Sequence, residues 1–294
     1  MCEYESIKEL FEEKAYPIAK LCQILRVSRS AYYRWLNYPK SNSDWTNEKI
    51  AVEIKKIHAA HPDMGYRRIR DELDKHHGIN VNDKRVLRIN RTMHIRSTIK
   101  YRSNGCTRAA KNPEHIAKNY LNRQFSAVSP NQKWLTDVTE FKYYVGSEVR
   151  KLYLSAILDM YDRRIVAYAI GNSNNNSLVF ETFDAAIASA PDANPLFHSD
   201  RGFQYTSLVF HEKLKRAGMK QSMSRVAHCL DNAPMEGFWG ILKREMYYGH
   251  KFTEQTELAQ AIGEYIYYYN HRRLQRRLSI MTPMEYYSHY SLSA

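Results

Sequence analysis

The sequence predicts a mixed α/β domain preceded by small all-α modules, and three observations carry this prediction. The chain has 294 residues, which suits a catalytic domain with smaller modules attached at roughly 100 to 200 residues per domain. Apolar residues recur at helical spacing in the first 97 residues. Beyond residue 131, β-rich segments alternate with helical ones, a pattern typical of layered α/β domains.

Composition narrows the class of protein before any motif is considered. Hydrophobic residues make up 44% and charged residues 26%, which argues against wholesale disorder or a fibre. No apolar run reaches the roughly 18 residues of a membrane helix, and the start does not resemble a secretory signal. We therefore expect a cytoplasmic protein without membrane contact. The four cysteines are scattered without a C-x-x-C pair, which indicates reduced thiols.

Residues 1–40 are expected to form a helix-turn-helix segment. Apolar spacing predicts helices over residues 7–14 and 18–25, and Ser28 is a candidate N-cap for a third helix over 29–36. In a helix-turn-helix unit the second helix enters the major groove, and Arg29 and Arg34 could contact phosphates or base edges there. Short helical hairpins are common, so a purely structural role stays an equal alternative.

A second helical module is expected over residues 44–97, after a polar linker at 40–46. Its helices are predicted around residues 50–58, 66–75 and 83–93. Gly78 can end the middle helix, and Asn82 can cap the last one. This module is a second candidate for DNA binding.

Positive charge is concentrated in the first part of the chain. The net charge is +13; residues 1–130 hold 25 basic and 14 acidic residues, and residues 131–294 hold 19 and 17. Between residues 84 and 111 there are nine basic residues and no acidic one. Such a density is typical of proteins that bind nucleic acid, because a polyanion neutralises it with release of counterions. A solvent-exposed basic face without a partner is the alternative.

Residues 98–130 are predicted to form a basic linker that ends at Ser129-Pro130-Asn131.

The remaining residues, 131–294, form the predicted catalytic core with C-terminal helices. Strands expected over 133–144, 151–160 and 164–170 follow at turn spacing and suggest an antiparallel meander. Short strands are predicted at 196–199 and 220–224. Helices are predicted over 177–190, 207–217, 232–248 and 254–271.

Three carboxylates have unusual local settings in this core. Asp137 lies in the middle of a strand, Asp200 ends a short apolar strand, and Glu236 lies in the first turn of a helix that Asn232 is expected to cap. Each also has a purely structural explanation: Asp137 as a polar group at a strand edge, Asp200 as a turn residue, and Glu236 as a favourable charge at a helix N-terminus. Together they offer hard oxygen ligands without a soft one, which favours Mg²⁺ or Mn²⁺ over zinc. Two such ions can drive an in-line displacement at a phosphodiester.

The segments around these carboxylates resemble a known family. Residues 134–141, 198–207 and 231–243, with 35 residues between Asp200 and Glu236, look like the three blocks of the DDE integrase core in insertion-sequence transposases, specifically the OrfB proteins of the IS-three family. The segment His-Pro-x-x-Gly-Tyr-Arg-Arg-Ile at 61–69 and the C-terminal Tyr-Tyr-Asn-His-Arg-Arg also resemble that family. The match spans nearly the whole chain.

The resemblance implies an RNase H-like fold, a metal-binding triad of Asp137, Asp200 and Glu236, two Mg²⁺ or Mn²⁺ ions, and DNA transposition as the activity. It also implies double-stranded DNA as the partner, a homo-oligomer on DNA, and an upstream-frame protein or fusion. One departure is Val226-Ala227, where the family more often has a basic residue and glycine.

Candidate DNA-contacting residues follow from charge and position. Lys243 comes seven residues after Glu236 and lies on the same predicted helix face as Glu236 and Gly240. Four arginines also follow the tyrosine run at 267–269, whose side chains are expected to lie in the core. The full set of candidates is Arg29, Arg34, Arg67, Arg68, Lys84, Arg85, Arg88, Arg91, Arg96, Lys243, Arg272 and Arg273. Two other functions stay open: a non-catalytic DNA-binding remnant that acts as a repressor, and a nuclease of the same fold.

Overall fold

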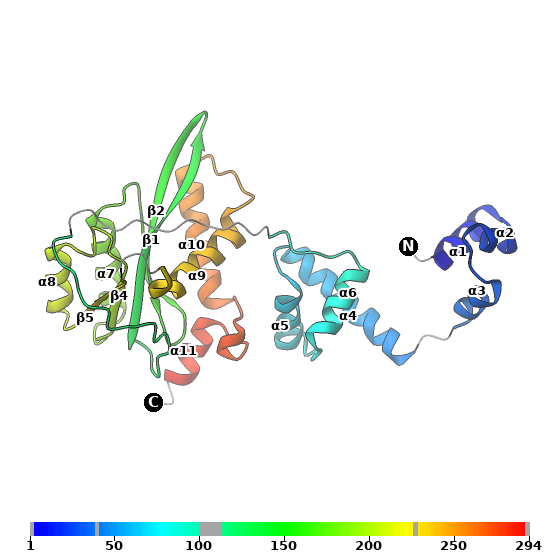
Figure 1. The fold of residues 1–294 in the computed structure, drawn as a ribbon, viewed down its shortest axis with the longest axis horizontal. Coiled ribbons are helices and arrows are strands. Elements are labelled where there is room, and N and C mark those ends of the chain that lie inside the picture. The colour runs from blue at the N-terminus through cyan, green and yellow to red at the C-terminus, as the bar shows by residue number, and fades with distance from the viewer. Residues whose placement is uncertain (1–2, 39–40, 100–112, 226–228, 292–294) are drawn as a thin grey trace. The chain divides into compact units, whose positions relative to one another are not determined.

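The computed structural model describes residues 3–38, 41–99, 113–225 and 229–291 (Figure 1). The chain divides into two compact units, residues 1–56 and residues 57–294. None of the helices within the described ranges is both long and apolar enough to cross a lipid bilayer. The departure at Val226-Ala227 lies outside the described residues.

The first unit begins with three short helices, α1 (Glu3–Lys14), α2 (Ile18–Ile24) and α3 (Arg29–Leu36). Their buried faces meet in a small core of Ile7, Leu21, Cys22 and Tyr32. The predicted helix, turn, helix arrangement is confirmed. Ser28 does occupy the N-cap position of α3, but its hydroxyl bonds to the Ser30 hydroxyl at 2.7 Å instead of to a backbone N–H.

Helix α4 (Asn42–Ala60) crosses from the first unit into the second. The predicted linker at 40–46 is therefore wrong for residues 42–46. The cause is a reciprocal cap: the Ser41 backbone N–H donates to the Asp44 carboxylate at 2.9 Å, and the Asp44 N–H donates to the Ser41 hydroxyl at 3.2 Å. This pair satisfies N–H groups that the first turn leaves open, so the helix starts there.

Helices α5 (Tyr66–His77) and α6 (Asp83–Thr92) complete the second helical module. Gly78 follows α5 at φ 64°, a left-handed conformation that glycine adopts without a steric penalty. The Asn82 side chain accepts from the Arg85 N–H at 2.8 Å and caps α6. Both predicted end signals are confirmed.

The core is built on a five-stranded mixed sheet in the order β3-β2-β1-β4-β5. Strands β1 (Lys133–Val145), β2 (Glu148–Asp159) and β3 (Ile165–Gly171) form the predicted antiparallel meander, with Asp137 opposite Ala156. Strands β4 (Leu196–Ser199) and β5 (Lys220–Met223) run parallel to β1. The carboxyl ends of β4 and β5 therefore reach the same edge of the sheet.

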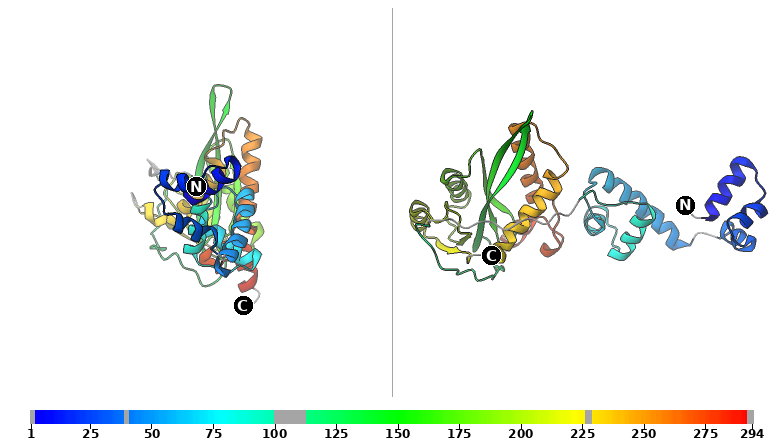
Figure 2. Two further views of the ribbon diagram at one scale, coloured as in Figure 1. Left: turned by 90° about the vertical axis from the view of Figure 1, so that its right-hand side faces the viewer. Right: turned by 45° about the horizontal axis from the view of Figure 1, so that its top comes forward.

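Helices cover both faces of this sheet (Figures 1 and 2). On one face, Trp134 and Ile157 pack with side chains of α7 (Asn176–Ser189) and α8 (Leu208–Arg216). On the other face, Leu135 and Leu154 pack with side chains of α9 (Ala233–Leu242) and α10 (Gln255–His271). Alternate strand residues thus point into two separate hydrophobic layers.

The C-terminal part differs in detail from the predicted helices. The α-helix expected up to residue 248 ends at Leu242 and continues as a π-helical turn, η2 (Lys243–Tyr247). Short 3-10 turns, η1 (Cys229–Asn232) and η3 (Arg276–Leu278), and a last helix, α11 (Pro283–Ser291), complete the fold. In the tyrosine run, Tyr269 is buried as expected, whereas Tyr267 is exposed.

The second half of the predicted linker lies against the core. The backbone N–H groups of Tyr120 and Leu121 both donate to the Ser222 hydroxyl on β5, at 2.9 and 3.1 Å. The Leu121 side chain is buried in the core layer that contains α9. Residues 113–125 therefore carry positions that belong to the core, whereas residues 100–112 lie outside the described chain.

Candidate active site

Asp137 occupies the middle of β1, and its side chain is almost completely buried. One carboxylate oxygen, Oδ1, accepts from the Val138 N–H at 2.8 Å. The other, Oδ2, accepts from the indole N–H of Trp239 on α9 at 3.0 Å. A strand and a helix therefore fix the orientation of this carboxylate together.

Asp200 follows directly after β4, the strand that pairs with β1. Its Oδ1 accepts from the Gly202 N–H at 2.9 Å, which folds the turn back on the carboxylate. A Cβ atom at position 202 would lie 3.1 Å from that same oxygen and 2.9 Å from the Gln204 side-chain oxygen. A side chain at position 202 would therefore have to displace the Gln204 amide and crowd the Asp200 carboxylate.

Glu236 lies in the first turn of α9 and is exposed. The prediction that Asn232 caps this helix with its side chain is wrong. The Asn232 amide donates instead to the backbone oxygen of Thr136 at 3.1 Å, so it ties the start of α9 to the residue before Asp137. This contact brings the glutamate helix to the strand that carries the first aspartate.

The charge of Asp200 acts on both of the other carboxylates. Burial raises the pKa of Asp137 to about 8, together with the charge of Asp200 and a smaller effect of Glu236. Burial also raises the pKa of Asp200. The pKa of Glu236 is raised by partial burial and by the charge of Asp200. Ionising all three is unfavourable unless a cation compensates the charge.

The donor set is chemically suited to a hard divalent ion, since it consists of carboxylate oxygens only. Within the described ranges, no group of three or more acidic, histidine or cysteine side chains is already gathered closely enough to hold a metal ion. Glu236 is the exposed member of the set.

A buried polar network behind the site escaped the sequence analysis. The ring of His198, two residues before Asp200, lies between the hydroxyls of Ser222 and Ser224 at 2.9 and 3.1 Å. Burial lowers the pKa of His198 to about 4. On the other side, the Tyr205 hydroxyl lies 3.2 Å from the Thr136 hydroxyl and is fully buried. Each contact joins positions distant in sequence, so spacing along the chain carries no signal for it.

Lys243 lies at the end of α9, and its ammonium group is 5.1 Å from the centre of the Phe141 ring. Burial lowers the pKa of Lys243, while the charges of Asp137 and Glu140 act in the opposite direction. The lysine therefore lies within electrostatic reach of the first aspartate. The space beside Gly240 is filled by the guanidinium of Arg244, which a Cβ atom there would approach to 2.9 Å.

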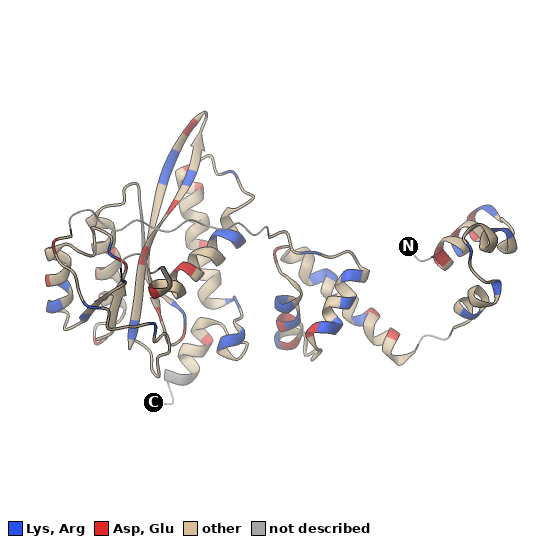
Figure 3. Ribbon diagram, viewed as in Figure 1, with Lys and Arg blue, Asp and Glu red and all other residues tan. Residues whose placement is uncertain are grey.

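Most of the other candidate DNA-contacting side chains are exposed. Arg29 and Arg34 lie on α3, and Figure 3 shows basic residues along α5 and α6 in the second module. Exposed members in and around those helices are Arg67, Lys84, Arg88, Arg91 and Arg96, and Arg272 is exposed after α10; Arg85 is partly buried. Their contact with DNA stays a prediction.

Two candidates are held inside the protein. Arg273 donates to both Glu245 oxygens, and Arg68 forms ion pairs with Glu245 at 3.0 Å and Asp63 at 2.8 Å. The Arg68 guanidinium also donates to the Tyr268 hydroxyl at 2.8 Å. Since these guanidinium groups already have protein partners, their geometry favours a structural role over contact with DNA.

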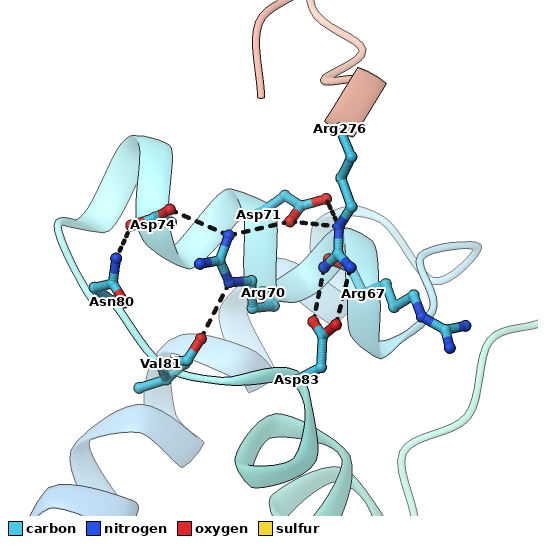
Figure 4. Close-up of polar contacts among 8 residues, drawn as sticks. All are labelled: Arg67, Arg70, Asp71, Asp74, Asn80, Val81, Asp83 and Arg276. Carbon is cyan, nitrogen blue, oxygen red and sulfur yellow. Dashed lines mark hydrogen bonds and ion pairs between the residues drawn. The ribbon is translucent and has the colours of Figure 1, made fainter. Parts of the chain in front are cut away.

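Arg276 is the most extensively bonded arginine of the C-terminal cluster (Figure 4). Its Nε–H donates to both oxygens of Asp71 at 2.8 and 2.9 Å, and its two amino groups donate to Asp83 at 2.7 and 2.9 Å. It also reaches the Arg67 backbone oxygen at 3.0 Å. One side chain thus connects η3 with α5 and with the first turn of α6.

An integrase core domain model matches residues 127–229, a second one matches residues 236–290, and an HTH-like domain model matches residues 45–103. With the mixed sheet and its carboxylates, these matches define a polynucleotidyl transferase of the DDE transposase and integrase class, with an RNase H-like core. InsK, a transposase of insertion sequence IS150 from Escherichia coli K12, is 36% identical over 92% of this chain and 93% of its own length. The chain belongs to the insertion-sequence transposases of the IS-three family.

Two further relatives span most of the chain. A 31 kDa protein of insertion element IS600 from Shigella sonnei is 36% identical over 92% of this chain and 98% of its own length. InsF, the transposase of IS3A from Escherichia coli K12, is 27% identical, with 88% and 91% covered. The family resemblance inferred from the three sequence blocks is confirmed, and the activity is DNA transposition and integration.

Proposed function

We propose that Asp137, Asp200 and Glu236 are the metal-binding catalytic triad with which this transposase cleaves the ends of its insertion sequence and joins their 3′-hydroxyls to target DNA. The observation that carries the assignment is the convergence of these carboxylates from β1, the end of β4 and the first turn of α9, where the charge of Asp200 raises the pKa of both Asp137 and Glu236. Asp137 is buried and Asp200 is partly buried, in positions where their negative charge is costly.

Integrase core domains depend on divalent metal. We propose Mg²⁺ or Mn²⁺ for this chain, with two ions held by the three carboxylates. When bound, two such ions activate an attacking hydroxyl and stabilise the leaving oxygen of a phosphodiester. The protein contributes the orientation: Trp239 and Val138 hold the Asp137 carboxylate, and the Gly202 N–H holds that of Asp200.

For the partner we propose double-stranded DNA, both element ends and target. The exposed arginines of α3 and the exposed basic face of α6 would contact the phosphate backbone and position the duplex. Lys243 would supply positive charge beside the triad. A homo-oligomer on DNA, and an upstream-frame protein or a fusion with it, complete the proposal.

Two other functions can be distinguished from transposition by the DNA products that they form. A non-catalytic repressor would bind element ends without cutting them, and a nuclease of the same fold would cut without joining. The raised pKa values of Asp137 and Asp200 favour catalysis over the first function, because a repressor gains nothing from placing two aspartates where their charge is unfavourable. Only a joined product separates the transposase from the nuclease.

The experiment is a strand-transfer assay with candidate element ends in Mg²⁺ or Mn²⁺, with wild type, Asp200→Asn and Asp192→Asn. Asp192 is an exposed aspartate between α7 and β4 and serves as the matched control. We expect Asp200→Asn to abolish cleavage and joining while DNA binding persists, and the control to react like wild type. Cleavage by Asp200→Asn at the wild-type rate would remove Asp200 from the triad.

A further inference from the structure

Asp231 is a fully buried aspartate with five hydrogen bonds from three side chains and one backbone N–H. Arg225 donates its Nε–H and one amino group to the two carboxylate oxygens, each at 2.9 Å. Arg123 adds its Nε–H at 2.8 Å, and Asn119 its amide at 2.9 Å. These arginine contacts, led by Arg225, lower the pKa of Asp231, so the carboxylate stays ionised.

The charges in this cluster do not balance. Two guanidinium groups surround one carboxylate, and both arginines keep a large exposed fraction, 41% of the Arg123 side chain and 44% of the Arg225 side chain. Beyond the bonds to Asp231, their other guanidinium N–H groups have no partner among the residues that the structure describes. The cluster therefore presents fixed donors and an excess positive charge to solvent.

The cluster around Asp231 lies near the residues of the triad. Arg225 follows the carboxyl end of β5, just as Asp200 follows the carboxyl end of the neighbouring β4, and the Ser224 N–H bonds to the Ser199 oxygen at 2.9 Å. Asp231 lies next to Asn232, whose amide binds the residue before Asp137. Asp200 and Arg225 thus lie at the same edge of the sheet, and Asp231 brings Arg123 next to Arg225.

A third arginine completes the arrangement. Arg201 directly follows Asp200, and its Nε–H donates to the Ser224 backbone oxygen at 2.8 Å. Its guanidinium is thereby fixed on the β5 side of the triad, bonded to the residue that precedes Arg225. A phosphate that approaches three carboxylates is repelled by them, and fixed arginines beside them offset that repulsion.

We propose that Arg123, Arg201 and Arg225, held by Asp231 and the Ser224 oxygen, form a preorganised site for a DNA phosphodiester next to the catalytic triad. The inference rests on the proposed function and deepens it by naming where the backbone of the reacting DNA is held. Arginine suits this task because its planar fork bonds a phosphate through two parallel N–H groups, and anchoring by Asp231 lowers the entropy lost on binding. The ligand chemistry is a phosphodiester, whether in an element end or in target DNA.

The test measures DNA binding by the full chain in EDTA, where no chemistry occurs. A labelled open-ended duplex and a closed circular plasmid of the same sequence are titrated at several salt concentrations. The Arg201→Gln/Arg225→Gln double variant should bind about tenfold or more weakly, since it removes charged hydrogen bonds to the phosphate. Its log–log salt slope should fall by about 0.9 for each phosphate that the variant no longer neutralises. Arg201→Lys/Arg225→Lys, which keeps the charges, should retain most of the slope.

Two further variants separate this site from a merely structural ion pair. Asp231→Asn leaves both arginines charged but loosens their anchor, so it should keep the wild-type salt slope and weaken DNA binding less than the double glutamine variant does, whereas a structural pair predicts equal weakening. Arg150→Gln removes another exposed arginine that is paired with a carboxylate, at the distal end of β2, and should leave the salt slope unchanged.

The outcomes are distinct. Weaker binding of both DNA forms supports a site for target backbone, and weaker binding of the open-ended duplex alone supports a site for element ends. A wild-type slope in the double glutamine variant, or equally weakened binding by Asp231→Asn, overturns the inference. If the wild-type chain binds neither DNA, the proposed function fails instead.

Discussion

The indole N–H of Trp239 donates to Oδ2 of Asp137 across 3.0 Å, and this bond links the glutamate-bearing helix to the central strand of the sheet. Trp239 itself is buried in the hydrophobic layer between α9 and the sheet. The hydrogen bond lowers the pKa of Asp137, against the stronger effect of burial. Trp239 is thus a positioning residue that stabilises the charged form of the carboxylate.

We predict that Trp239→Phe weakens catalysis more than stability. Phenylalanine keeps an aromatic ring in the layer but removes the donor. A hydrogen bond to a charged group contributes about 1.5 to 3 kcal/mol, so cleavage should fall about tenfold or more. The pKa of Asp137 should rise, which shifts the pH–rate profile to higher pH. Metal-dependent cleavage between about pH 6 and 9 measures both effects.

Trp134→Phe is the matched control, because Trp134 is also buried and its indole donates to a different aspartate, Asp159, at 3.2 Å. It should lower the melting temperature without moving the pH–rate profile. An unshifted profile in Trp239→Phe would show that the indole bond does not tune Asp137.

His198 should make the stability of the protein depend on pH. Its folded-state pKa is about 4, below the unperturbed 6.5, because burial disfavours the imidazolium. Between these values the unfolded chain binds a proton that the folded chain does not. The contribution of His198 to the free energy of unfolding should therefore be complete above about pH 6.5 and fall by about 3 kcal/mol as pH drops toward 4. His198→Asn should flatten this part of the curve in denaturant titrations, and an equally steep curve would contradict the assignment.

Arg276 should contribute to the stability of the protein, whereas Arg272 should contribute little. Arg276→Ala leaves Asp71, a largely buried carboxylate, with only the weaker contact to Arg70 at 3.5 Å. We expect it to cost about 1 to 3 kcal/mol and to speed hydrogen exchange in α5 and α6. Arg272→Ala, at an exposed position, should cost about 0.5 kcal/mol or less. Equal exchange rates in the two variants would mean that the Arg276 contacts stabilise neither helix.

The exposed basic face of α6 and its C-terminal extension should account for part of the salt dependence of DNA binding. Arg88, Arg91 and Arg96 are all exposed. Replacing the three by alanine should lower the log–log salt slope by about 0.9 for each phosphate left without its arginine, with little change in melting temperature. A slope equal to that of wild type would mean that these side chains do not touch the backbone.

The strands and helices of the core were predictable wherever one face is buried. Strand β1 was expected over 133–144 and observed over 133–145, because its side chains alternate between two apolar layers. Strand β2 begins at Glu148, three residues earlier than expected. Its first residues lie in a hairpin end exposed on both faces, so they carry no alternating pattern. Helix α11 has a local start signal in its sequence, because Thr282 and Glu285 form a reciprocal cap with hydrogen bonds of 2.9 and 3.1 Å.

The site was predictable only as a set of carboxylates. Their residue types and flanking segments identify a DDE core, but their partners come from elsewhere in the chain. Trp239 is 102 positions from Asp137, and Arg123 is 108 positions from Asp231. Such contacts depend on how β1, β5 and α9 pack, and no periodicity in the sequence encodes them. For the same reason Arg68 and Arg273, which look like surface cations in the sequence, lie in internal ion pairs.

Glu236→Gln should keep the fold and lose the chemistry. Glutamine is nearly isosteric, so Phe238 and Leu242 should pack as before, yet the charge that helps to hold a divalent ion is gone. If Glu236 were only a favourable first-turn charge, the change would cost about 0.3 to 1 kcal/mol of stability and leave joining intact. The raised pKa of Glu236, caused by partial burial and then by Asp200, indicates the opposite sign for stability in the metal-free protein. We therefore expect an unchanged or higher melting temperature without metal together with an absence of 3′-end joining. Retained joining with a lowered melting temperature would assign Glu236 to the helix instead of the triad.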